Sequence, residues 1–206
     1  MVEVGEGVTG RGPGDRVLAM TGIGGYSEQV VLDARRAISP PDSMSFDQAG
    51  AIPVTYGTAY HMLAHLGNLA RGVPVLVHHA AGGVGPAAAQ TCKAFGASLI
   101  VGTASAPKRE FVESLGMRFV DRESEDFVEV CKGATGGKGV HHAIDPVGGS
   151  HVMRSYKALR RCGKLPHFRA SSAATGDDRW WGPALRLRPT QPRFHPVKSM
   201  SLNQSS

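Results

Sequence analysis

The residues that point most directly to chemistry are the small residues at 80–85, which read AAGGVG. Ala80, Gly82 and Gly85 occupy the three small-residue positions of the dinucleotide-binding fingerprint, with alanine in place of the first glycine. In that pattern Gly82 lets the backbone approach a pyrophosphate, and Gly85 lets the following helix pack closely on the strand. Glycine makes up 27 of 206 residues, so the interpretation depends on finding a strand before this turn and a helix after it.

A second group of candidate residues follows about 20 residues later, where a fingerprint that binds NAD usually has a carboxylate for the ribose hydroxyls. This chain reads GTASAPKR at 102–109 and has no carboxylate there. Ser105 as a hydrogen-bond donor, with Lys108 or Arg109 as a cation, suits the additional 2′-phosphate of NADPH. The alternative is that these cations are only solvated in the first turn of a helix. Arg122 is a further candidate for the same phosphate.

Asp145 follows the predicted strand at 140–144, at the edge of a parallel sheet where ligands of this fold class bind. It has two interpretations of equal weight, a ligand contact or a cap for the next helix. The histidine pairs at 78–79 and 141–142 resemble metal ligands, but adjacent residues of a strand point to opposite faces. We therefore predict no metal site. No Ser-His-Asp or Cys-His arrangement stands out, so no catalytic residue is assigned.

The elements that would position these residues alternate between strand and helix. The apolar run at 73–77 has the length and β-branched content of a buried parallel strand, and an alanine-rich helix follows the glycine turn. Strands are expected near 73–79, 98–102, 118–120, 140–144 and 163–168, with helices near 84–95, 107–115, 124–132 and 150–160. This order predicts an α/β fold with a doubly wound parallel sheet.

The chain before this alternation has a different pattern. Residues 1–33 are predicted to form β structure with glycine-rich turns, and Ser45 is a candidate N-cap for a helix. A further apolar helix is expected at 58–66. After residue 170 the regular pattern ends in a segment rich in proline, for which we expect loop or disorder.

The formal net charge of +6 is concentrated from Arg154 onward, where eleven Lys or Arg residues accompany two Asp residues. A solvated basic tail is the favoured explanation, and contact with an anionic membrane surface is the alternative. No RNA-binding aromatic motif accompanies these charges, so we predict no nucleic-acid partner.

Cysteine usage and hydropathy indicate the cellular environment. Cys92, Cys131 and Cys162 are odd in number and widely spaced, which argues against a disulfide framework or a zinc knuckle and favours reduced, structural thiols. No apolar run is long enough to span a membrane, and the first residues lack the features of a signal peptide. A cytoplasmic location is the expectation.

Taken together, several segments resemble the zinc-independent quinone oxidoreductase branch of the medium-chain dehydrogenase/reductase superfamily. Three of them are also similar to the sub-branch that contains the vesicle amine transport protein homologue: VHHAAGGVG, GTASAPK and DPVGG. The other matching segments, in chain order, are VGEGVTGRGPGDRV, GGYSEQVVL, MSFDQAGAIPVTYGTAYHML and TGGKGVHHAIDPVGG. The resemblance covers residues 2 to about 176.

This resemblance implies a Rossmann-type NADPH-binding domain at 59–170, preceded by a partial GroES-like catalytic segment at 1–58 and followed by the basic tail at 171–206. It implies zinc-independent hydride transfer from NADPH to a quinone or an α,β-unsaturated carbonyl compound. Thr58, Val147 and Gly148 would lie near the nicotinamide. The full set of cofactor-binding residues so implied is Thr58, Ala81, Gly82, Gly83, Val84, Gly85, Ser105, Lys108, Arg122, Asp145, Val147 and Gly148.

The chain also departs from the family pattern. Members begin well upstream of Met1 and continue past Ser206, so a fragment or truncated product is expected, and the usual homodimer is doubtful. Pro166 falls in the predicted strand at 163–168, which suggests that this strand is an edge, is distorted or is damaged. An NADPH-binding or interaction module without turnover is therefore the alternative function.

Overall fold

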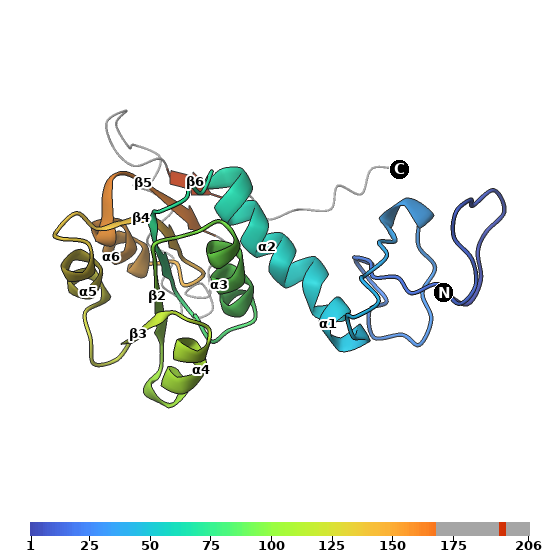
Figure 1. Cartoon of the computed structure of the whole chain (residues 1–206), viewed down its shortest axis with the longest axis horizontal. Helices are drawn as coiled ribbons and strands as arrows, with labels where there is room; N and C mark the ends of the chain where they lie inside the picture. Colours follow the sequence, from blue (N-terminus) through green and yellow to red (C-terminus); the bar gives the residue numbers. More distant parts are fainter. Residues whose placement is uncertain (168–193, 197–206) are drawn as a thin grey trace. The chain divides into compact units, whose positions relative to one another are not determined.

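The computed structural model describes residues 1–167 and 194–196. The chain divides into two compact units, Met1–Gly57 and Thr58–Ser206 (Figure 1). The division falls beside the segment boundary expected from the sequence, and each unit is described by itself.

The first unit has little regular structure. Its helical elements are the 3₁₀ turn η1 (Ala34–Arg36), helix α1 (Phe46–Ala51) and the π-helical segment η2 (Ile52–Tyr56). The β structure expected at 1–33 is reduced to a single antiparallel bridge, between Leu18 and Ile38. A strand needs a neighbouring strand for its backbone hydrogen bonds, and these segments do not pair with one another in the described chain.

Helix α1 begins at the predicted N-cap. The Ser45 hydroxyl accepts a hydrogen bond from the Gln48 backbone N–H at 3.1 Å, and the Gln48 side chain accepts one from the Ser45 N–H at 2.9 Å. This reciprocal capping box satisfies two amides that the first turn of a helix leaves without partners. The N-cap prediction is confirmed.

The second unit is built on a parallel sheet with strand order β3-β2-β1-β4-β5-β6. The order reverses between β1 and β4, as in a doubly wound fold, so the predicted fold class is confirmed. The strands are β1 (Pro74–Val77), β2 (Leu99–Ala104), β3 (Arg118–Asp121), β4 (Val140–Ile144), β5 (Leu159–His167) and β6 (Phe194–Pro196).

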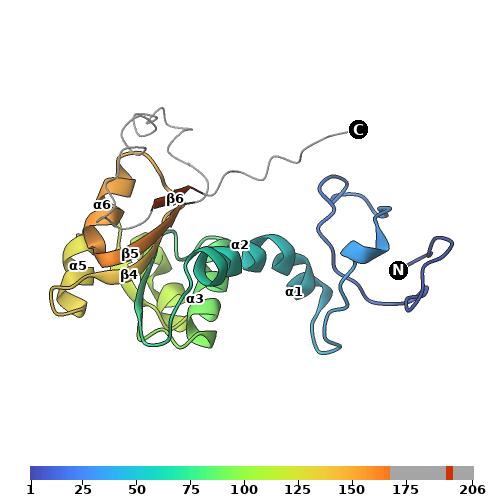
Figure 2. The ribbon, with the colours of Figure 1, turned by 90° about the horizontal axis from the view of Figure 1, so that it is seen from above.

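Helices cover both faces of this sheet. Helices α5 and α6 pack against each other on one face, and α3 lies on the other (Figure 2). The helical elements of the unit are α2 (Gly57–Tyr60), the π-helical η3 (His61–Leu66), α3 (Val84–Ala94), the 3₁₀ turn η4 (Ala106–Lys108), α4 (Arg109–Ser114), α5 (Phe127–Ala134) and α6 (His151–Ala158). The helix expected at 58–66 is present in α2 and η3, largely as π-helical turns.

The core of the unit lies between the sheet and helices α5 and α6. Leu76, Val101 and Val140 come from three different strands and are completely buried. Phe127 and Val152 pack against them from α5 and α6. This arrangement explains why the strands are continuous apolar runs, since both faces of a doubly wound sheet are covered.

The strand that contains Pro166 is internal in the described sheet. Strand β5 pairs with β4 on one side and with β6 on the other, so the edge alternative is wrong. The distorted alternative fits, because the register against β4 shifts between Val140 and His142 and Cys162 has a φ of +59°. The Pro166 carbonyl still accepts a hydrogen bond from the Asp145 N–H at 3.2 Å.

The cysteines are free, and two of them belong to the interior. Cys92 and Cys131 are completely buried, and burial raises the pKa of each thiol to about 12. Both are therefore unreactive structural thiols at neutral pH, as predicted. Cys162 is exposed.

Two sequence predictions concern the end of the chain and its hydropathy. The predicted basic tail at 171–206 lies outside the described residues, apart from the three residues of β6. No helix in the described part of the chain is both long enough and apolar enough to cross a membrane.

Candidate functional site

Three strands end together at the carboxyl edge of the sheet. Val77, the last residue of β1, is in register with Gly102 of β2 and Ile144 of β4. Beyond the strands, the Ala80 N–H donates to the Thr103 carbonyl at 3.0 Å. In open α/β sheets this edge, at the point where the strand order reverses, is where ligands bind.

The turn from β1 to α3 forms the fingerprint predicted from the sequence. The Gly82 N–H donates to the His79 carbonyl at 2.8 Å, and the Gly85 N–H donates to the Gly82 carbonyl at 3.1 Å. Gly82 and Gly83 are exposed where α3 begins. Exposed glycine backbone at the N-terminus of an 11-residue helix is suited to binding a phosphate group.

Gly85 is required for the close approach of α3 to the strand. A Cβ atom at this position would lie 2.0 Å from the Ala80 carbonyl oxygen and 2.4 Å from the Ala80 carbonyl carbon. These are backbone atoms, so no side-chain rotation relieves the clash. The packing role predicted for the last glycine of the fingerprint therefore agrees with the geometry.

A pocket of about 170 Å³ opens beside this turn. Its wall combines the glycine turn, the end of β2, the η4 turn and the residue that follows β3. The Arg122 N–H donates to the Ala104 carbonyl at 2.9 Å, which fixes the start of the Arg122 side chain next to β2. The lining residues are His79, Ala81, Gly82, Ala104, Ser105, Lys108 and Arg122.

The structure thus brings together five of the residues selected from the sequence, namely Ala81, Gly82, Ser105, Lys108 and Arg122. Gly83, Val84 and Gly85 belong to the same turn, where α3 begins. Thr58 lies in α2, is half-buried and is not among the residues that line this pocket. Arg109, the alternative cation, stacks on the Phe119 ring at 4.3 Å and pairs with Glu113 at 3.3 Å.

Asp145 organises the turn after β4. Its Oδ1 atom accepts hydrogen bonds from the Val147 N–H at 2.8 Å and the Gly148 N–H at 3.2 Å. The side chain is completely buried. It is not the cap of the next helix, because the N-cap of α6 is Ser150 and the Asp145 bonds close the turn before that helix. Val147 and Gly148 are consequently held in a defined conformation at the carboxyl end of β4, and the cofactor contact proposed for Asp145 itself stays a prediction.

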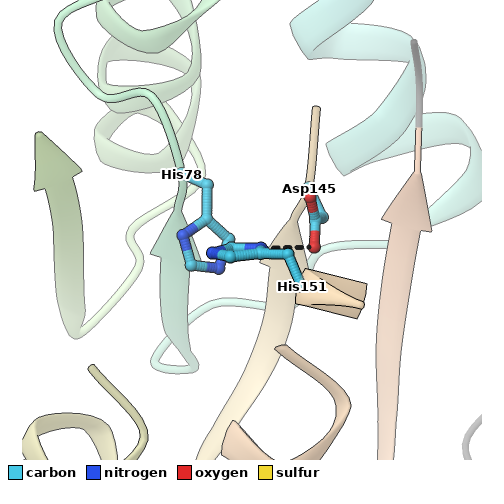
Figure 3. A group of neighbouring side chains, drawn as sticks. All are labelled: His78, Asp145 and His151. Atoms are coloured by element: carbon cyan, nitrogen blue, oxygen red, sulfur yellow. Dashed lines mark hydrogen bonds and ion pairs between the residues drawn. The ribbon is translucent and has the colours of Figure 1, made fainter. Parts of the chain in front are cut away.

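A buried hydrogen-bond network joins this turn to the end of β1. Figure 3 shows three of its members, His78, Asp145 and His151, with the contact between His151 and Asp145 dashed. Ser155 of α6 donates to Asp145 Oδ2 at 2.7 Å and lies 3.0 Å from His78 Nε2. Because the single Ser155 proton goes to Asp145, His78 donates from Nε2 and accepts at Nδ1 from the Thr103 hydroxyl, at 2.9 Å. His151 Nδ1 completes the network, 3.1 Å from Asp145 Oδ2.

Three members of this network have the atom types of a metal site. Nitrogen or oxygen atoms of His78, Asp145 and His151 lie within 4.8 Å of one another. The Ser155 hydroxyl lies among these atoms, and hydrogen bonds within the protein account for all three side chains. The alternation argument does not describe the adjacent histidines. His78 and His79 lie in the turn after β1 rather than in the strand, and on β4 the Nδ1 atoms of His141 and His142 lie 2.9 Å apart.

Burial controls the charge of this network. Desolvation lowers the pKa of His78 to about 3, so its imidazole is neutral at neutral pH. Burial alone would raise the pKa of Asp145, but hydrogen bonds from His151 and Ser155, together with the charges of the neighbouring histidines, bring it below its ordinary value. At neutral pH the network therefore holds the Asp145 carboxylate beside the neutral imidazole of His78.

Because two histidines are buried in the neutral form, we expect the folded protein to be less stable in mild acid. Desolvation lowers the pKa of His142 to about 4 and that of His78 to about 3, whereas an unfolded chain binds each proton near pH 6.5. Between these values the unfolded state holds more protons, so lowering the pH favours unfolding. We expect the free energy of unfolding to drop by about 2 to 3 kcal/mol between about pH 7.5 and about pH 5.5.

Urea unfolding at these two pH values, followed by circular dichroism, checks this expectation. Replacing the exposed His61 by Gln is the matched control and should leave the pH dependence unchanged. A His142→Gln variant should be less stable throughout but should lose about half of the pH dependence. Equal stability of the unaltered chain at both pH values would show that these histidines are not buried in the neutral form.

Several residues of the site were not selected from the sequence. His79 and Ala104 line the pocket, and Thr103 and Ser155 complete the buried network. The position of His79 next to the fingerprint was an available signal, but the histidine pair suggested only a metal role, which strand alternation excluded. Ser155 lies in α6 and reaches β1 only through the folding of the sheet.

Comparison with known proteins agrees with this architecture. Residues 83–173 match the family model described as zinc-binding dehydrogenase. The synaptic vesicle membrane protein VAT-1 homolog of Rattus norvegicus is 38% identical over 190 residues, which cover 88% of this chain and 47% of that protein. The chain therefore spans about half the length of this relative.

Solved structures of similar fold include two reductases. The quinone oxidoreductase of Pseudomonas syringae matches with a TM-score of 0.61 and 32% identity, over 66% of this chain and 42% of that one. The CurK enoyl reductase matches with a TM-score of 0.67 and 29% identity, over 81% of this chain and 48% of that one.

Proposed function

Because the chain belongs to the medium-chain dehydrogenase/reductase superfamily, we propose that it is an NADPH-dependent oxidoreductase whose hydride acceptor is a quinone or an α,β-unsaturated carbonyl compound. The observation that carries the cofactor assignment is the pocket beside the glycine turn, which combines Ser105, Lys108 and Arg122. The acceptor class is proposed from the relatives that are quinone and enoyl reductases.

The charge of this pocket favours NADPH over NADH. A site for NADH usually places a carboxylate on the ribose hydroxyls, and that carboxylate repels a 2′-phosphate. Among the described residues that line this pocket there is no carboxylate, while Lys108 and Arg122 supply two cations. The Ser105 hydroxyl adds a short, neutral hydrogen-bond donor next to them. Charge-assisted hydrogen bonds of this kind are among the strong ones.

The rest of the cofactor would extend from this pocket along the carboxyl edge of the sheet. The exposed backbone of Gly82 and Gly83, at the positive end of α3, is suited to the pyrophosphate. Val147 and Gly148, fixed by Asp145, lie at the end of β4. We assign them to the nicotinamide end, where they would orient the ring.

The nicotinamide supplies the hydride chemistry when the cofactor is bound, and the protein contributes binding and orientation. This chain's own residues would hold the phosphates, fix the turns and exclude water around the buried network. No residue is assigned as proton donor to the acceptor. Independence from zinc, like the acceptor class, belongs to the proposal.

Turnover is tested by following NADPH absorbance with a soluble benzoquinone and, separately, with a simple enone. We expect NADPH oxidation that depends on both the protein and the acceptor, at a rate that saturates with NADPH. NADPH binding without oxidation by either acceptor would contradict the proposed activity and favour a binding module without turnover. Protein denatured by heat serves as the control for direct reaction between NADPH and the quinone.

A further inference from the structure

The basic pocket has a third nitrogenous side chain that the cofactor assignment does not use. His79 lines it together with Lys108 and Arg122, and the three residues come from three different segments of the second unit. His79 follows β1, Lys108 ends η4 and Arg122 follows β3. The His79 side chain is exposed, whereas that of its neighbour His78 is 2% exposed and belongs to the buried network.

The backbone at His79 has an unusual conformation. Its φ angle is +51°, in the left-handed region that few non-glycine residues adopt, among which histidine and asparagine are enriched. The hydrogen bond from the Gly82 N–H to the His79 carbonyl, 2.8 Å long, closes this turn. The fingerprint turn therefore holds the His79 backbone in one position at the wall of the pocket, and the imidazole is attached there.

We propose that His79 is a titrating phosphate ligand of this pocket. Its protonated form strengthens NADPH binding, so the preference for NADPH over NADH decreases as the pH rises and His79 loses its proton. This inference rests on the proposed NADPH binding and adds a pH-dependent control to the same site. Its chemical target is the phosphomonoester that distinguishes the two cofactors.

The charges around His79 determine the direction of the effect. Lys108 from η4 and Arg122 from the turn after β3 are cations of the same pocket, and like charges disfavour a third cation beside them. His78, the adjacent residue, is neutral. The acidic Glu123 pairs with Arg122 at 3.3 Å and is not among the lining residues.

Binding of a phosphate dianion reverses the effect that the neighbouring charges have on the protonation of His79. An imidazole ordinarily titrates near pH 6.5, and a neighbouring dianion favours its protonated form. Cofactor binding should therefore take up a proton at His79, and the imidazolium should strengthen the contact. NADH has no phosphate at this position, so its binding should not be coupled to this protonation.

The test compares the unaltered chain with a His79→Asn variant by titration with NADPH and NADH at about pH 6.5 and about pH 8.5. Asparagine tolerates the same left-handed backbone but does not titrate. A phosphomonoester remains largely dianionic across this range, because its second pKa is near 6. For the unaltered chain we expect NADPH binding to weaken by about five- to tenfold at the higher pH, with NADH binding unchanged.

The variant should bind NADPH with the same affinity at both pH values, within about twofold, and should match the unaltered chain at the higher pH. Identical pH profiles for the two proteins, or an equal pH effect on NADH, would overturn the role of His79. Absence of NADPH binding at every pH would overturn the proposed function as well, so the two failures are distinguishable. Unchanged NADH affinity in the variant confirms that it is folded.

Calorimetry of NADPH binding provides a second measurement. Titrations at about pH 7.5 in two buffers of different ionisation enthalpy give the number of protons taken up on binding. We expect uptake of a substantial fraction of one proton by the unaltered chain and close to none by His79→Asn. No uptake by the unaltered chain would contradict the proposal independently of any variant.

Discussion

A chain that carries Gly85→Ala is expected to lose more than about 3 kcal/mol of folding free energy. The new methyl group would lie 2.0 Å from the Ala80 carbonyl oxygen and 2.8 Å from the Ala80 Cα atom. This clash can be relieved only if the start of α3 moves away from the end of β1. That movement also exposes the buried alanines of α3. Most folded domains have a free energy of unfolding of only about 5–15 kcal/mol.

Thermal and urea unfolding, followed by circular dichroism, measure this loss. Gly133→Ala is the matched control, because Gly133 lies within helix α5 and a Cβ atom there meets nothing within 4 Å. That variant should be stabilised by up to about 1 kcal/mol, the helix preference of alanine over glycine. A Gly85→Ala chain within about 1 kcal/mol of the unaltered one would contradict the close packing described for this turn.

Removal of the two permanent cations of the pocket should abolish cofactor discrimination. In a Lys108→Ala, Arg122→Ala double variant we expect NADPH affinity to fall by about 100-fold, because each charge-assisted hydrogen bond to a phosphate is worth about 1.5–3 kcal/mol. NADH affinity should change by less than about threefold. Both side chains are exposed, so the fold should be unaffected.

Lys138→Gln is the control for a general loss of positive charge. Lys138 is exposed and precedes β4, at the amino end of the sheet, away from the pocket. This variant should bind NADPH as the unaltered chain does. Two results would show that the pocket does not recognise the 2′-phosphate. One is an equal loss of affinity for NADPH and NADH in the double variant. The other is a loss of NADPH affinity in Lys138→Gln as large as in the double variant.

Much of the second unit could be predicted because its signals are local. The apolar run before the glycine turn, the turn itself and the alternation that follows each depend on residues close in sequence. Strands β1 to β4 and helices α3 to α6 therefore lie near the predicted positions. The capping box at Ser45 and Gln48 is local in the same way.

Features that depend on contacts distant in sequence were less predictable. Ser155 and His78 are 77 residues apart, yet their side chains meet because β1 and β4 are neighbours in the sheet. Pro166 indicated a distorted strand, but its place between β4 and β6 depends on a strand almost thirty residues later. In residues 1–33 the pattern indicated β structure, although no ladder forms there in the described chain.

The pocket contains residues of both kinds, those that could be predicted from nearby sequence and those that depend on contacts distant in sequence. Lys108 and Ser105 follow β2 at the spacing of the fingerprint, so their role could be proposed from the sequence. His79 was not selected although it adjoins the fingerprint, because its place on the wall depends on a left-handed backbone conformation and on the approach of β2 and β3. Sequence spacing thus identified the chemistry of the site but not its full set of side chains.

The most direct measurement is a titration of the unaltered chain with NADPH and, separately, with NADH, followed by nicotinamide fluorescence. We expect saturable binding of both, with NADPH bound about 100-fold more tightly, because only its phosphate engages Lys108 and Arg122. Equal affinity for the two cofactors, or no saturable binding of either, would contradict the assignment of this pocket to the 2′-phosphate of NADPH.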